Sequence, residues 1–309
     1  MFRFFLFKLL RALMTIILVV TFAFIVLRMS GDPAVIILGP DAPPQAIDAF
    51  RHAWGLDQPL WDQYLRYFGA IARGDLGVSM RDGQSAITLV SERIPATLEL
   101  TVPALILELI IGISAGVYAA LHRESIVDRA VMAGAVIGFT MPSFVLGLVL
   151  VLIFAVQLDW LPSGGQDTWV HAILPVITMS VGGIGILARF SRSAMIEILG
   201  QPYIRTASAK GMPWRKVVWR HALPNAAIPI VTIAGFMVGS LIAGAVVVES
   251  LFSWPGVGRL LVVSVSNRDL AVVQCILLMV AACMVLSNFT VDILYGYLDP
   301  RLRNMNAKG

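Results

Sequence analysis

Long apolar runs separated by shorter polar segments dominate the chain, and their lengths indicate a membrane protein. A helix needs about 20 consecutive apolar residues to cross the hydrocarbon core of a bilayer. Six segments approach or exceed that length, so the sequence predicts an all-α integral membrane protein with about six transmembrane helices. They lie at approximately Leu9–Leu27, Ala96–Leu121, Ala130–Leu158, Ala172–Ala188, Asn225–Val248 and Leu270–Tyr297.

Proline and overall composition refine this picture. The third segment, Ala130–Leu158, is too long for one straight crossing and contains Pro142. Proline has no amide hydrogen to donate inside a helix, and its ring clashes with the preceding turn, so we expect a kink or break near Thr140–Pro142. Hydrophobic residues make up 58% of the chain and charged residues 14%, with a mean hydropathy of +0.83, values that exclude an ordinary soluble domain.

Lysine and arginine indicate which way the helices cross the membrane, because cytoplasmic segments carry an excess of these residues. If the N-terminus lies inside, the inner segments hold 15 of the 23 cations and the outer segments hold 8. Six of those eight lie in one long outer loop, where charge has little influence on orientation. We therefore expect an N-in, C-in topology.

The first span raises the question of a signal peptide, since it begins with basic residues. Arg28-Met29-Ser30 offers no small-x-small cleavage site, which favours an uncleaved anchor. The predicted parts of the chain are an anchor helix (1–28), an outer loop (29–95), a core of five membrane helices (96–300) that contains a cytoplasmic loop (191–224), and a cytoplasmic tail (301–309).

A strongly basic segment, Tyr203–Pro224, interrupts the apolar pattern on the predicted inner side. Two stretches compatible with a helix meet at Gly211-Met212-Pro213, where glycine permits a positive φ and proline can begin the next helix. We interpret the segment as a helix–turn–helix that docks on a partner; the alternative is that its cations only set the topology. The segment contains no carboxylate, and its cations are Arg205, Lys210, Arg215, Lys216 and Arg220.

Sequence motifs for catalysis are missing. The chain has no G-x-x-x-x-G-K-[ST] phosphate-binding loop, no G-x-S-x-G nucleophile elbow and no H-E-x-x-H zinc motif. The four histidines are scattered singly, at His52, His122, His171 and His221. We expect no catalytic residue, no metal site and no cofactor bound by this chain, which would then not be an enzyme.

Two features inside the predicted spans admit two interpretations each. Glu108 lies near the middle of the second span, where a charge is costly to bury. It either lines a transport pathway or is a buried polar group paired within the bundle. Small residues recur every four positions in the fifth span, and they pack either within the chain or against a second membrane subunit. These small residues are Gly235, Gly239 and Ala243.

The basic segment resembles the cytoplasmic coupling loop of permeases of bacterial ATP-binding-cassette (ABC) importers, whose general pattern is E-A-A-x3-G-x9-I-x-L-P. Four residues match this pattern at the right spacing: Ala207, Gly211, Leu223 and Pro224. Three positions depart from it: Arg205, Thr206 and His221. The departures are typical of the dipeptide/oligopeptide/nickel branch, which carries Y-[VI]-R-T-A-x-A-K-G and R-H-A-L.

Further motifs similar to the first (B-type) permease subunit of this branch occur in order along nearly the whole chain. They include Gly31-Asp-Pro-Ala, Gly55-Leu-Asp-Gln-Pro-Leu, Arg73-Gly-Asp-Leu-Gly, Arg93-Ile-Pro-Ala-Thr-Leu-Glu-Leu, Pro142-Ser-Phe, Trp160-Leu-Pro, Phe252-Ser-Trp-Pro-Gly-Val-Gly-Arg and Leu298-Asp-Pro-Arg. The resemblance implies a multi-pass bundle of the type I importer kind in the bacterial inner (plasma) membrane, with the outer loop in the periplasm.

The resemblance also implies the rest of the complex. A homologous second permease subunit would pair with this chain in the lipid bilayer, and two cytoplasmic ATP-binding subunits would use ATP and Mg²⁺. A periplasmic or lipid-anchored substrate-binding protein would deliver the substrate, and no nucleic acid is involved. The residues that it assigns to ATPase coupling are Tyr203, Arg205, Thr206, Ala207, Ala209, Lys210, Gly211, His221, Leu223 and Pro224.

The substrate is the least determined part of this prediction. The breadth of the branch favours di- or oligopeptides, and the alternatives for the same type of complex are nickel, glutathione or another small solute. Two other classes remain open from the residues alone: an ion-coupled secondary transporter, in which Glu108 would bind the ion, and a membrane scaffold or sensor. Neither of these classes predicts the coupling-loop pattern.

Overall fold

The computed structural model describes residues 2–29 and 31–298, so the predicted tail (301–309) lies outside the described residues. The described residues are helical apart from turns, loops and one isolated bridge between Val78 and Ser85, which confirms the all-α prediction. They form two compact units. The first takes residues 2–97 and 255–283, and the second takes residues 98–254 and 284–298.

The first unit combines the N-terminal part of the chain with residues 255–283. Its helices are α1 (Phe2–Met29), α2 (Pro33–Leu38), α3 (Pro44–Ala53), α4 (Leu60–Ala72), α5 (Ala86–Ser91), α14 (Val257–Ser266) and the first half of α15 (Leu270–Leu298). Ala86 and Val90 of α5 pack against Val272 and Ile276 of α15 in a fully buried cluster. Nearby, the Ser79 hydroxyl donates a hydrogen bond to the buried carboxylate of Asp269. Segments almost 200 residues apart therefore share one core.

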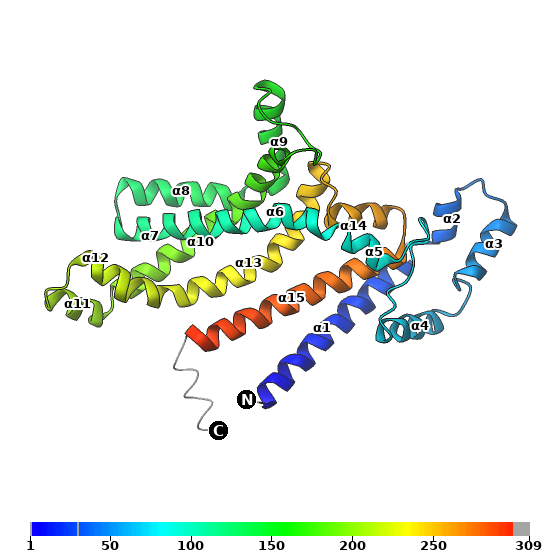
Figure 1. Cartoon of the computed structure of the whole chain (residues 1–309), viewed down its shortest axis with the longest axis horizontal. Helices are drawn as coiled ribbons and strands as arrows, with labels where there is room; N and C mark the ends of the chain where they lie inside the picture. The colour runs from blue at the N-terminus through cyan, green and yellow to red at the C-terminus, as the bar shows by residue number, and fades with distance from the viewer. Residues whose placement is uncertain (1, 30, 299–309) are drawn as a thin grey trace. The chain divides into compact units, whose positions relative to one another are not determined.

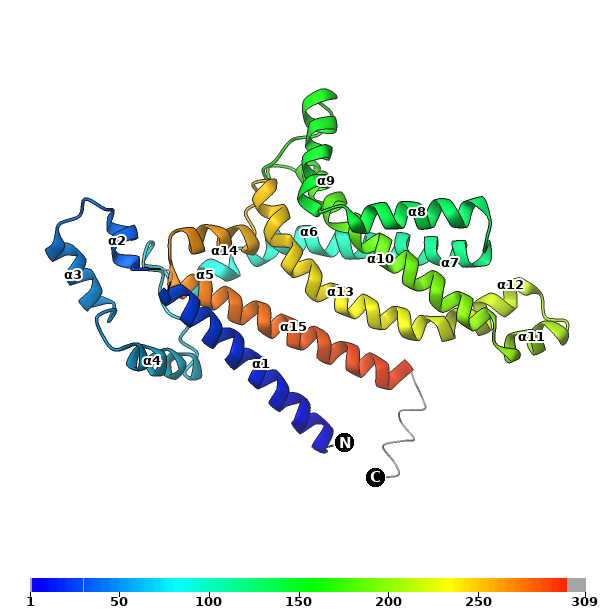
Figure 2. The same ribbon diagram turned by 180° about the vertical axis from the view of Figure 1, so that it is seen from behind.

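The second unit is a helical bundle arranged around one long helix, α10 (Ile173–Leu199), which packs against α7, α8 and α13 (Figures 1 and 2). Helix α6 (Ile94–Leu107) continues through a π-helical turn, η1 (Glu108–Gly112), into α7 (Ile113–Leu121). The remaining elements are α8 (Ile126–Thr140), α9 (Ser143–Leu150), η2 (Val151–Gln157), η3 (Trp169–Ala172), α11 (Pro202–Ala209), α12 (Trp214–Val217), η4 (Val218–Ala222) and α13 (Leu223–Leu251).

The helices of membrane-spanning length agree with most of the predicted spans. Four helical stretches of the described chain are long and apolar enough to cross a bilayer, and a bent pair makes a fifth. The bent pair is α8 with α9–η2, which meet at 102°, so the break expected near Pro142 is confirmed. Helix α1 also forms, and within its described residues Leu13–Val26 is a shorter apolar stretch.

Glycines allow α7 and α8 to lie directly against α10. A Cβ atom on Gly116 of α7 would overlap the Ala188 carbonyl oxygen of α10. Likewise, a Cβ atom on Gly185 of α10 would overlap the Ala135 carbonyl oxygen of α8. The three backbones therefore approach more closely than any side chain at these positions permits.

Helix α10 extends further than the apolar pattern predicted. It continues from Ala188 to Leu199, so the first nine residues of the predicted cytoplasmic loop (191–224) belong to this helix. Arg192 lies within this extension, and its guanidinium donates Nε to Asp128 Oδ1 at 2.5 Å and Nη2 to Asp128 Oδ2 at 2.6 Å. The Asp128 side chain is only 4% exposed and also accepts the Glu124 backbone N–H at 3.0 Å. This ion pair links the C-terminal part of α10 to the first turn of α8.

Candidate functional site

The basic segment folds as two short helices joined by a tight turn. Helix α11 ends at Ala209, and Gly211 then adopts a φ of +81°, which favours glycine. Pro213, with φ −56° and ψ 136°, precedes the first residue of α12, and α12 continues through the π-helical turn η4 into α13. Figures 1 and 2 show α11 and α12 as one projection beyond the ends of α10 and α13.

One face of this projection is built into the core of the second unit. Ile204 of α11 is 2% exposed and Val217 of α12 is fully buried, and both belong to the same hydrophobic cluster as Met195 of α10. Ala207 and Leu223 pack against this cluster as partly buried residues. Because the two short helices share a core with α10 and α13, a force applied to them reaches those long helices directly.

The other face of the projection is basic and aromatic, and it is open to solvent. All five cations of the segment are exposed, and none forms an ion pair with a described residue. Three aromatic side chains accompany them: Tyr203 is 43% exposed, Trp214 is 54% exposed and Trp219 is 64% exposed. Arginine and large aromatic residues are the types that carry most binding energy in protein interfaces. We call this exposed set the docking face: Tyr203, Arg205, Lys210, Trp214, Arg215, Lys216, Trp219 and Arg220.

The other residues of the predicted coupling motif occupy the flanks of the projection. The Thr206 hydroxyl donates to the Pro202 carbonyl oxygen at 3.0 Å, so it closes a turn within α11. His221 is half-buried, and its Nε2 has no hydrogen-bond partner among the described residues. Ala209 and Pro224 are exposed. The structure therefore divides the motif into residues that anchor the projection and residues that face outward.

Glu108 is buried inside the second unit. Its side chain is 2% exposed, and Oε2 makes no hydrogen bond within the described part of the chain. It is the first residue of the π-helical turn η1 and faces Gly183 of α10, where a Cβ atom would overlap the Glu108 carboxyl group. The carboxyl group borders a cavity of about 180 Å³ lined by residues of α9, α10 and α13.

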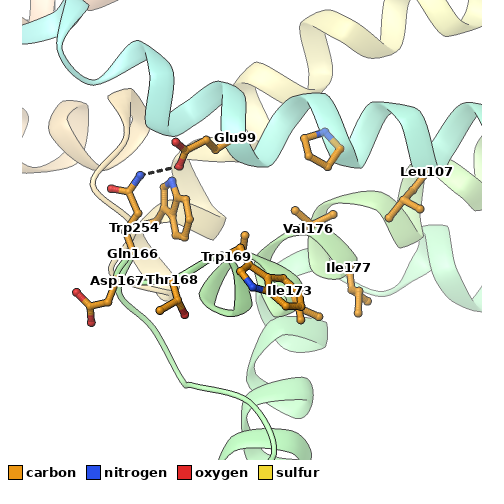
Figure 3. A pocket seen from close by; sticks show the side chains of 12 residues that line it. Glu99, Leu107, Gln166, Asp167, Thr168, Trp169, Ile173, Val176, Ile177 and Trp254 are labelled. Carbon is orange, nitrogen blue, oxygen red and sulfur yellow. Dashed lines mark hydrogen bonds between the residues drawn. The ribbon is translucent and has the colours of Figure 1, made fainter.

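A second cavity, of about 650 Å³, lies between α6, the start of α10 and the chain before it (Figure 3). Glu99 Oε2 accepts a hydrogen bond from Gln166 Nε2 at 2.7 Å at one end of this cavity. The walls include the buried indole of Trp254 and the indole of Trp169, which is 78% exposed. Sequence reasoning missed the two tryptophans as cavity residues, because they are 85 positions apart and no local pattern connects them.

The small residues of the fifth span divide between two environments. The Gly235 carbonyl oxygen accepts a hydrogen bond from Ser287 Oγ at 3.3 Å, and a Cβ atom on Gly239 would lie 3.7 Å from Met284 Cγ. Both glycines therefore face α15 within the chain. Ala243 is exposed. Packing within the chain therefore accounts for the two glycines. The exposed Ala243 is free to contact a second membrane subunit.

Comparison with known proteins identifies the class to which this fold and this docking face belong. Residues 112–304 match the family described as "Binding-protein-dependent transport system inner membrane component", and residues 1–101 match the family of its N-terminal part. The chain belongs to this family and is an ABC-importer permease of the peptide/nickel branch.

Individual relatives agree with this assignment. The chain is 41% identical over 297 residues to the glutathione transport system permease protein GsiC of Escherichia coli O6:H1, covering 96% of this chain and 97% of the relative. It is 40% identical over the same length to the protein of that name from Shigella dysenteriae serotype 1. Among solved structures, it resembles a chain of the inward-facing MetNI methionine ABC transporter with a TM-score of 0.59, covering 69% of this chain and 97% of that chain at 20% identity.

Proposed function

We propose that this permease subunit moves short peptides, a class that includes glutathione, inward across the bacterial inner membrane. ATP hydrolysis on two cytoplasmic subunits would drive transport, with Mg²⁺ and ATP bound by those subunits and no cofactor held by this chain. A homologous second permease and a binding protein on the outer side would complete the complex. The peptide class is supported by the name of the relatives, glutathione transport system permease.

The docking face is the observation that carries the coupling part of this proposal. It offers five exposed cations that form no ion pair with a described residue and three exposed aromatic rings, which suits a groove of a partner protein lined with carboxylates and helix C-termini. The same projection is anchored in the core through Ile204 and Val217. A partner that pulls on the docking face therefore moves α10 and α13 together.

The continuity of α12, η4 and α13 supplies the mechanical link. No loop separates α12, which carries part of the docking face, from α13, so a rotation of α12 is transmitted along that helix. Residues of α13 line the cavity at Glu108. Closure of the ATPase subunits on nucleotide would thus favour one arrangement of the bundle over another through differential contacts with the docking face.

The coupling proposal is tested with the purified complex of both permeases, both ATPase subunits and the binding protein in liposomes. The variant Arg215→Glu/Lys216→Glu reverses two exposed charges of the docking face without touching the buried anchor. We expect uptake of glutathione or L-alanyl-L-alanine to fall at least tenfold, with membrane insertion unchanged. Arg123→Gln, which removes an exposed cation from the turn between α7 and α8, is the matched control.

Two outcomes of this test would contradict the proposal. If the double variant binds the ATPase subunits and transports as well as the Arg123→Gln control, the docking face is not the coupling surface. If the unaltered permease transports without any ATPase subunit and responds to an ion gradient instead, the chain belongs to the secondary-transporter class, for which the buried carboxyl group of Glu108 is the favouring observation.

A further inference from the structure

We propose that the cavity at Glu108 is an ammonium-binding site that receives the positively charged amino group of the transported substrate. This inference rests on the proposed peptide transport and adds a residue and a recognition chemistry to it. The starting observation is a buried carboxyl oxygen that lacks a hydrogen-bond partner in the described part of the chain. A polar group buried in a protein is nearly always hydrogen-bonded, yet Glu108 Oε2 has no partner among the described residues.

The backbone on both sides of the Glu108 carboxyl group contributes to its burial. Glu108 begins a π-helical turn, in which one extra residue is accommodated and the side chains are redirected. Such turns are frequent at functional sites. Across from it, Gly183 leaves room for the carboxyl group, because a Cβ atom there would overlap it. The backbones of η1 and α10 therefore create the space that holds the carboxyl group, whose Oε2 has no hydrogen-bond partner among the described residues.

The surroundings of the carboxyl group define what it can bind. Glu108 is the sole ionisable side chain among the described residues that line the cavity. The walls are apolar, with Met179, Met237 and Leu241 buried. A carboxyl group that ionises can pair with a cation, and the apolar walls around it suit an aliphatic stem on that cation. A primary ammonium group on a short alkyl chain has both properties.

The size and position of the cavity restrict the ligand further. A buried apolar cavity of about 150 Å³ holds a benzene-sized molecule, so 180 Å³ accommodates the aminoalkyl end of a peptide and not a whole peptide. Ser143, Gly182 and Gly244 on its border are half-exposed, so the space is reachable from the surface of the bundle. Glu108 lies 13 residues before the end of the apolar helical stretch Ala86–Leu121. A substrate amine on a short alkyl chain therefore fits this site.

The test measures ligand-induced thermal stabilisation of the full purified complex in detergent. The probe is n-butylammonium chloride, compared with sodium chloride at equal ionic strength and with n-butanol as the uncharged analogue. A ligand at ten times its dissociation constant raises the melting temperature of a protein of this size by roughly 2 to 5 °C. We expect that rise with n-butylammonium and not with n-butanol.

Variants assign the effect to Glu108. Glu108→Gln removes the ionisable carboxyl group at nearly constant shape, and Gly183→Ala places a methyl group on that carboxyl group; both should abolish the rise. Gly134→Ala is the matched control, since its Cβ would have no atom within 4 Å and Gly134 does not line the cavity. A rise that is absent in the unaltered complex, equal for n-butanol, or retained in Glu108→Gln overturns the inference.

This outcome is separable from the proposed function. Failure of coupling appears as lost uptake in the docking-face variant or as transport without ATPase subunits, and neither depends on n-butylammonium. Conversely, if the unaltered complex transports a peptide while the probe has no effect on its melting temperature, the ammonium site is refuted and the coupling proposal stands.

Discussion

The ion pair between Asp128 and Arg192 allows a quantitative prediction, because its two members differ in exposure. The Asp128 side chain is 4% exposed, whereas that of Arg192 is 27% exposed. In Arg192→Met, the buried carboxylate keeps only the Glu124 N–H as a partner. In Asp128→Asn, the remaining guanidinium can still reach water, and the amide retains an acceptor for that N–H. We therefore expect the arginine substitution to be the more damaging of the two.

Removing one member of a buried ion pair costs about 3 to 5 kcal/mol when it leaves an uncompensated buried charge. The partial exposure of Arg192 places Arg192→Met near the lower limit, at about 3 kcal/mol, and Asp128→Asn at about 1 kcal/mol. At roughly 2 to 4 °C per kcal/mol, Arg192→Met should lower the melting temperature by about 8 °C. Asp128→Asn/Arg192→Met leaves no buried charge, so its cost should be smaller than the sum of the single costs.

The assay is thermal unfolding of the purified permease in detergent, with both single variants and the double variant measured side by side. Arg123 forms an ion pair with Glu124 at 3.2 Å, and both side chains are mostly exposed, so Arg123→Gln should change stability by less than about 1 kcal/mol. The reasoning is refuted if Arg192→Met costs no more than Arg123→Gln. Strict additivity in the double variant would equally show that the two side chains are not coupled.

Two further predictions concern packing and buried hydrogen bonds, each with a matched control. Gly185→Ala forces α8 and α10 apart and should lower the free energy of unfolding by about 1 to 3 kcal/mol. Gly134→Ala, with no atom within 4 Å of the new Cβ, should be neutral or slightly stabilising. Equal melting temperatures for the two variants would contradict the close contact between α8 and α10. Ser79→Ala removes the hydroxyl that donates a hydrogen bond to the buried Asp269 carboxylate, and it should lower the free energy of unfolding by roughly 1 to 3 kcal/mol. The assay is limited proteolysis of the first unit. Ser91→Ala, which loses an exposed hydrogen bond to the Thr88 carbonyl oxygen, should be near neutral. A protease sensitivity that is the same in both serine variants would argue against the Ser79–Asp269 contact.

Local chemistry made some elements predictable from the sequence. The break at Pro142 and the turn at Gly211 depend on restrictions that a proline and a glycine impose on their own backbone, so no knowledge of distant residues was needed. The basic segment was equally visible, because five cations and no carboxylate in 22 residues stand out between apolar spans. These features locate the docking face in the sequence. The structure adds which side of the projection formed by α11 and α12 is buried.

Contacts between distant residues account for what sequence reasoning could not supply. The extension of α10 to Leu199 includes Arg192, which pairs with Asp128 at a position 64 residues earlier in the chain. Apolar periodicity alone ends the span at Ala188, since it treats every arginine as a residue that must leave the membrane. The sequence also left Glu108 open between a group that lines a transport pathway and a buried group paired within the bundle, and only the position of Gly183 in space shows where the carboxyl group lies.

The shared core of the first unit bears on how this protein can be recombined with its relatives. The two family matches divide the chain between residues 101 and 112, yet Ala86 and Val90 are buried against Val272 and Ile276, which lie inside the second match. The N-terminal part is therefore not a module that can be exchanged alone. A chimera that takes residues 1–97 from another permease will need residues 255–283 from the same donor, because side chains of the two segments pack into one core.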